Sequence, residues 1–252
     1  MLAKLLLTPA LIVGASLAQR RWGARVAGVL VGLPLTAGPL MLFLALEQGA
    51  PFAAIAAAGS LRGLVPLAAF CVVYGRLCPH RGWGWSAIGA AAVFCVVAAA
   101  LAQVTPPVLA SFVLVLAVLG VSVRSMPRAP VAVGPVWAPN WELPLRAGIG
   151  TAMVCLLTAA ATALGANATG VLAPFPAVSG TLVVFTHRRD GATQARSMLD
   201  GVLRGSFAYA LFFVVLSWGL GALSLWQAFA AALGSAVAVL LVTRERVSAP
   251  RS

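Results

Sequence analysis

Long apolar stretches alternate with short polar or Gly- and Pro-bearing breaks along this chain. Each stretch approaches the length of about 20 residues with which an α-helix crosses the hydrocarbon core of a bilayer. The stretches lack the short alternating pattern of a membrane β-barrel. The pattern predicts nine transmembrane helices, over Leu2–Ala18, Arg25–Leu46, Phe52–Tyr74, Trp83–Ala102, Pro107–Val123, Leu143–Leu164, Gly170–Phe185, Ala192–Trp218 and Ala222–Val242.

Composition supports an all-α polytopic membrane protein. Hydrophobic residues make up 62% of the chain, charged residues 9%, and the mean hydropathy is +1.01. A water-soluble fold of this size would have too little polar surface to cover such a core. The four cysteines are scattered without a CxxC pair, which predicts small core residues rather than disulfides or metal ligands.

The net charge of +12 is explained by the position of the basic residues. Fourteen of the 17 lie on alternate connections or in the tail, as the positive-inside rule requires, so nucleic acid is not expected as a partner. The bilayer itself is the expected environment. This distribution predicts a multi-pass inner-membrane protein with its N-terminus outside and its C-terminus in the cytoplasm.

The chain contains an internal repeat. A shift of 142 positions places Pro34–Arg76 on Pro176–Trp218 without a gap, with 15 identities in 43 residues. About four would be expected by chance in a chain of this composition. The identical pairs include a proline, several glycines and a LeuArgGly tripeptide. In order, Pro34, Gly38, Gly49, Gly59, Arg62 and Gly63 correspond to Pro176, Gly180, Gly191, Gly201, Arg204 and Gly205.

The helix count gives the repeat its orientation. Predicted helices 1–4 correspond to helices 6–9, and an offset of five helices makes the two copies cross the membrane in opposite directions. We therefore expect an inverted-topology 4+1+4 arrangement: repeat 1 over residues 1–104, a linking helix and loop over 105–142, and repeat 2 with the tail over 143–252. The N-terminus resembles a cleavable signal peptide, but its helix has a counterpart in repeat 2, which favours retention.

Two arginines lie near the middle of predicted helices, at the equivalent positions Arg62 and Arg204. A charged side chain at mid-bilayer costs at least ~2.5–3.5 kcal/mol, so such residues usually have a function. One interpretation is an anion site made of two guanidinium groups. The other is structural, since Asp200 stands four residues before Arg204, at ion-pair spacing, where repeat 1 has Ala58.

Gly and Pro interrupt the second helix of each repeat, within residues 32–40 and 173–181. Such breaks are tolerated in a bilayer only where the freed backbone groups meet protein or water. Matching breaks in both halves indicate a transporter binding site, although a packing kink explains either break alone. The candidate residues are Pro34, Thr36, Gly38, Pro176, Ser179, Gly180 and Thr181.

Repeat 2 resembles the GlpM family of small bacterial membrane proteins. The resemblance lies in GlyValLeuAlaProPheProAla at 170–177, the following basic loop, GlyValLeuArgGly at 201–205 and LeuTrpGlnAlaPhe at 225–229. It implies a four-helix membrane unit, here duplicated, in a bacterial inner membrane. It implies little about substrate and does not extend to an arginine at position 204.

These observations favour a small secondary transporter or exporter of an anionic metabolite, working by alternating access at the repeat interface. A non-transporting scaffold or accessory subunit of an envelope assembly is the alternative, and a passive channel is a weaker one. Homo-oligomers are compatible with either. We expect no enzymatic activity, cofactor or metal, because the sequence has no phosphate loop, nucleophile–base set or HExxH motif.

Overall fold

The computed structural model describes residues 37–126 and 141–248, with positions 10, 13, 29 and 34. Throughout these two ranges the regular structure is α-helix, which confirms the all-α prediction for this part of the chain. Apart from those four positions, the predicted helix Leu2–Ala18 and residues 25–36, with the candidate residue Thr36, lie outside the described residues, as do residues 127–140 of the predicted linker.

The first half contains five helices in the described range. A turn at Gly49, with φ 89°, connects α3 (Ala37–Gln48) to α4 (Ala50–Arg62), and only Gly63 separates α4 from α5 (Leu64–Leu77). Pro66 has no N–H to donate to the carbonyl group of Arg62, so the helical ladder is interrupted there although Gly63 keeps helical dihedral angles. The helices α6 (Trp83–Ala102) and α7 (Val108–Ser125) follow the predicted boundaries closely.

The second half contains α8 (Glu142–Leu172), α9 (Ala177–Ala222) and α10 (Leu225–Ser248). A glycine with positive φ divides each of the first two: Gly165 with φ 75° in α8 and Gly191 with φ 85° in α9. Side chains other than glycine rarely adopt this conformation. We call residues 166–172 the short segment of α8, residues 177–190 the first arm of α9, and residues 192–222 its second arm.

Long apolar helices with outward-facing hydrophobic side chains are consistent with a membrane protein. Four helical stretches in the described ranges are long and apolar enough to cross a bilayer: Ala50–Leu77, Trp83–Ala102, Val108–Ser125 and Ser179–Ala222. The last includes the turn at Gly191. Large side chains on α6 and α7 are exposed, as expected for a lipid-facing surface: Trp85, Ile88, Val96, Leu109, Val113 and Val121.

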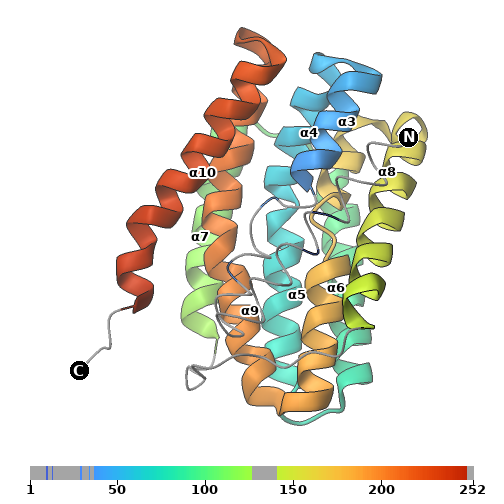
Figure 1. Cartoon of the computed structure of the whole chain (residues 1–252), viewed down its shortest axis with the longest axis vertical. Helices are drawn as coiled ribbons and strands as arrows, with labels where there is room; N and C mark the ends of the chain where they lie inside the picture. Colours follow the sequence, from blue (N-terminus) through green and yellow to red (C-terminus); the bar gives the residue numbers. More distant parts are fainter. Residues whose placement is uncertain are drawn as a thin grey trace.

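Equivalent positions of the two repeats adopt equivalent local structure. Gly49 and Gly191 have φ/ψ of 89°/162° and 85°/176°. The N–H of Gly38 donates to the Pro34 carbonyl at 2.8 Å, and that of Gly180 donates to the Pro176 carbonyl at 2.7 Å. The turn between α3 and α4 lies at the upper end of the molecule and the turn within α9 at the lower end (Figure 1).

The two halves also contact each other reciprocally. A Cβ atom added at Gly38 would lie 3.8 Å from the ring of Phe212, and one added at Gly180 would lie 3.5 Å from the ring of Phe70. Gly38 and Phe70 are the repeat counterparts of Gly180 and Phe212. Each repeat therefore presents its glycine to the phenylalanine of the other, as expected of two copies related by a twofold axis.

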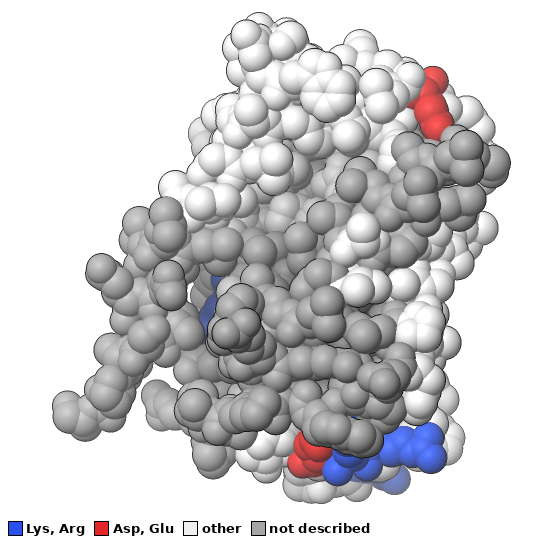
Figure 2. All heavy atoms as spheres, viewed as in Figure 1, with Lys and Arg blue, Asp and Glu red and all other residues white. Residues whose placement is uncertain are grey.

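Charged side chains are distributed unequally between the two ends. Arg76, Arg81 and Arg124 lie at or just beyond the ends of α5 and α7, and Arg188, Arg189 and Arg196 flank the turn within α9. Figure 2 shows several basic side chains with an acidic one beside them at the lower end of the molecule, and an acidic one at its upper end. We call the lower end the basic end and the opposite one the upper end.

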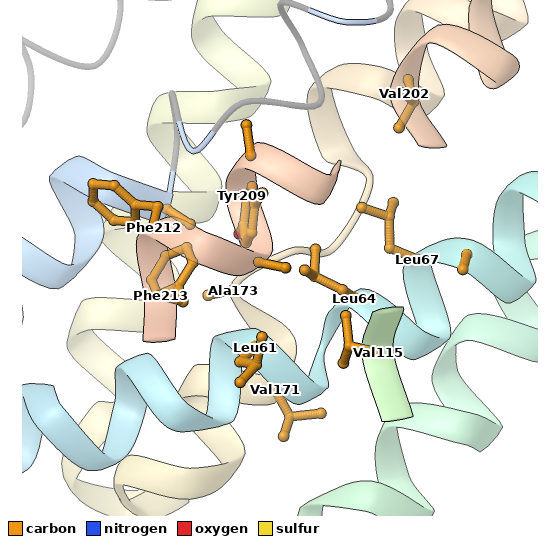
Figure 3. Packing of buried hydrophobic residues seen from close by; sticks show 14 of the residues in the cluster. Leu61, Leu64, Leu67, Val115, Val171, Ala173, Val202, Tyr209, Phe212 and Phe213 are labelled. Carbon is orange, nitrogen blue, oxygen red and sulfur yellow. The ribbon is translucent and has the colours of Figure 1, made fainter. Parts of the chain in front are cut away.

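The core forms where α4, α5, the short segment of α8 and the second arm of α9 cross (Figure 3). Leu61, Leu64, Tyr209 and Phe213 are at most 4% exposed and point toward one another around Ala173. All four cysteines are free thiols. Cys71 and Cys78 are buried as predicted, whereas Cys95 is exposed on α6, so the core assignment is wrong for that residue.

Candidate functional site

A break in the helical backbone lies between α8 and the first arm of α9, at residues 173–176. Pro174 and Pro176 supply no N–H, which would leave the carbonyl groups of Gly170 and Leu172 without their usual donors. The Ala173 N–H and the Ser60 hydroxyl both donate to the Gly170 carbonyl, at 3.0 and 3.1 Å, and the Phe175 N–H donates to the Leu172 carbonyl at 2.9 Å. The predicted helix Gly170–Phe185 is therefore two pieces joined by a break whose polar groups are partly satisfied within the protein.

Glycines bring this break into backbone contact with the other half. A Cβ atom at Gly59 would lie 2.7 Å from the Asn167 carbonyl oxygen, and one at Gly63 would lie 2.5 Å from the Val171 carbonyl oxygen and 2.8 Å from the Pro174 ring. A Cβ atom at Gly170 would lie 2.1 Å from the Ala56 carbonyl oxygen. These distances leave no room for side chains, so α4 and the short segment of α8 pack as small-residue membrane helices do.

Arg62 ends α4 beside this contact and is only 3% exposed. Its Nη2 donates to the side-chain oxygen of Asn167, while its Nε is buried without a hydrogen-bond partner. Asn167 in turn donates from Nδ2 to the Ala102 carbonyl at 2.7 Å. Arg62 therefore connects α4 to the short segment of α8 and, through Asn167, to the carbonyl end of α6. A buried guanidinium N–H is left free to donate.

Arg204 lies in a different environment. It forms an ion pair with Asp200, with 2.8 Å between Nε and Oδ2, as the four-residue spacing predicts. The side chains of Arg204 and Asp200 are 39% and 21% exposed. Each arginine is 13 residues from its glycine turn, a rise of about 20 Å, so both Cα atoms lie near mid-depth. The equivalent arginines thus differ in burial and in partner.

The other predicted site residues lie around the two breaks. Pro34 and Gly38 are buried at the start of α3, and Pro176 and Ser179 are buried at the start of α9. The Thr181 hydroxyl donates to the Ala177 carbonyl at 2.6 Å, within its own helix. Its donor is therefore used locally.

The sequence predictions missed Asn167 and Ser60 as partners of this region. A signal for Asn167 exists, because the repeat extends upstream of Pro34: Gly23 and Gly28 correspond to Gly165 and Gly170, with the same spacing to the following proline. Asn167 then corresponds to Arg25, so both repeats place a polar residue two positions after the glycine. Ser60 has Val202 as its counterpart and carries no such signal.

Comparison with protein-family models, with curated proteins and with solved structures finds no match to this chain.

Proposed function

We propose that this chain is an inner-membrane transporter or exporter of a small anionic metabolite, built from two inverted repeats that move against each other around the helix breaks. The N-terminus would face outward and the C-terminus the cytoplasm, because the basic end of a membrane protein faces the cytoplasm. The resemblance of repeat 2 to the GlpM family is compatible with this body plan, and membership of that family stays a prediction.

The observation that carries the proposal is the buried Arg62 beside the break at residues 173–176. A guanidinium group with a buried, unpartnered Nε–H is costly in an apolar surrounding and is suited to a carboxylate or phosphate ligand. Broken helices in the membrane interior occur where substrate is bound. The reciprocal contacts between Gly38 and Phe212 and between Gly180 and Phe70 support two repeats that meet across a twofold axis.

A non-transporting scaffold is the second candidate, and one observation favours it. The backbone contacts at Gly59 and Gly170 are tight, and Arg62 has a protein partner in Asn167. In that case the arginine would serve only to connect α4 to the short segment of α8 and to the end of α6.

Proteoliposome uptake with a panel of radiolabelled carboxylates and phosphate esters tests the first candidate, and two variants separate the roles of Arg62. Asn167→Ala removes the same hydrogen bond as Arg62→Ala but keeps the guanidinium group. If Arg62 binds the anion, Arg62→Ala abolishes uptake and Asn167→Ala retains it. Arg62→Lys also fails, because an ammonium group cannot form a bidentate contact.

The scaffold candidate predicts other results. No anion of the panel would be taken up by the wild type, and Arg62→Ala and Asn167→Ala would lower thermal stability to a similar degree. Equal uptake by wild type and Arg62→Ala would likewise exclude an arginine-dependent site.

A further inference from the structure

Polar contacts join the two halves at the basic end of the molecule. The Tyr74 hydroxyl lies 3.2 Å from Nδ1 of His187, and the Nε of Arg196 donates to the Gly75 carbonyl at 2.9 Å. The Cys78 thiol lies 3.8 Å from the Ala192 carbonyl oxygen. The end of α5 is therefore bonded to both arms of α9, immediately on either side of the turn at Gly191. We call Tyr74, Gly75, Cys78, His187 and Arg196 the latch.

The repeat counterparts of the latch are mostly apolar. In the repeat alignment, Leu216 corresponds to Tyr74 and Leu220 to Cys78. Ala45 corresponds to His187 and Ala54 to Arg196. Leu216, Leu220 and Ala45 are buried. At the upper end of the molecule, the positions that correspond to the latch are thus occupied by apolar side chains, three of them buried.

This asymmetry distinguishes the two ends energetically. Separating packed apolar groups exposes them to water at the full cost of their burial. Separating hydrogen-bonded groups next to the aqueous phase exchanges protein partners for water, and the net loss for each bond is small. The basic end is therefore the end at which the halves separate more readily.

We propose that the latch is a gate that closes the basic end of the molecule and opens when α5 moves away from the turn of α9, while the apolar counterparts of the latch at the upper end stay buried. The proposal rests on the proposed transport function, for which it assigns the cytoplasmic gate.

Cys78 provides a direct readout of the gate. Its thiol is 3% exposed within the latch, whereas Cys71, two helical turns deeper on α5, is 1% exposed. Burial raises the pKa of Cys78, and the charge of Arg196 lowers it in part. If Arg196 were lost and the gate stayed closed, the pKa of Cys78 would rise and the thiol would react more slowly. Opening of the gate would instead make the thiol react faster.

The experiment measures modification of Cys78 by a membrane-impermeant maleimide in inside-out vesicles, with mass spectrometry to locate the modified cysteine. Cys78 should react slowly in the wild type and about tenfold faster in Arg196→Ala, which loses a charge-assisted bond. Tyr74→Phe, which loses only a hydroxyl group, should show a smaller increase. Arg76→Ala is the matched control, because Arg76 is exposed one residue from Gly75 on the same helix. Cys71 should stay unmodified in every variant.

Equal rates at Cys78 in Arg196→Ala and Arg76→Ala would overturn the gate, as would modification of Cys71 in parallel with Cys78, which indicates unfolding. Anion uptake with the same proteins separates this proposal from the transport function. Uptake by the wild type with no acceleration at Cys78 in Arg196→Ala removes the gate and keeps transport. Acceleration in a protein that takes up no anion supports separation at the latch and removes transport.

Discussion

Gly170 provides the strictest test of the packing between the halves. An alanine Cβ at this position would lie 2.1 Å from the Ala56 carbonyl oxygen, and ordinary contact begins at 3.4 Å, so the helices would have to separate by 1.3 Å. The obstructing atom is backbone, which cannot rotate away. Overpacking of this kind costs about 1–3 kcal/mol.

The same displacement affects a hydrogen bond. The Ser60 hydroxyl is 3.1 Å from the Gly170 carbonyl oxygen, and this bond contributes about 1 kcal/mol. We therefore expect Gly170→Ala to lower the free energy of unfolding by about 2–4 kcal/mol. For a chain of this size that corresponds to a fall in the melting temperature of about 4–16 °C.

The assay is thermal unfolding in a mild detergent, followed by tryptophan fluorescence. Gly234→Ala is the control, because a Cβ at Gly234 in α10 would meet nothing within 4 Å. Alanine favours helix over glycine by up to about 1 kcal/mol, so this variant should be as stable as the wild type or slightly more stable. If Gly170→Ala were as stable as Gly234→Ala, the backbone contact between α4 and the short segment of α8 would be refuted.

Three further predictions follow from the positions of single residues. Ser60→Ala should lower the free energy of unfolding by about 1 kcal/mol in the same assay, with Ser235→Ala, whose hydroxyl bonds only its own helix, as the control. Equal stability of the two variants would show that the hydroxyl of Ser60 does not stabilise the break. Arg62→Ala should lower the free energy of unfolding by about 1–3 kcal/mol, because it removes a buried hydrogen bond to Asn167; unchanged stability would contradict the burial of this side chain. For topology, Asn167→Cys should be labelled from outside intact cells and Arg128→Cys only after permeabilisation, and a need for permeabilisation at position 167 would exclude the inverted repeat.

The sequence alone determined the class of the protein and much of its local structure. Helix is the only way to satisfy the backbone of long apolar stretches such as Trp83–Ala102, and this helix was predicted at its observed boundaries. Gly and Pro have backbone effects that need no tertiary partner, so a break near Pro174 and Pro176 could be predicted. The ion pair between Asp200 and Arg204 also follows from spacing on one helix.

Only the tertiary structure decided the environment of the two arginines. Both stand in a LeuArgGly tripeptide at equivalent depth, yet Arg62 is buried against Asn167, 105 residues away, while Arg204 is partly exposed. Burial depends on which helix crosses at that point. Here the crossing is set by Gly59, Gly63 and Gly170, whose missing side chains let two backbones approach. A glycine in the sequence shows that such an approach is allowed, but its partner is known only when both helices are placed together.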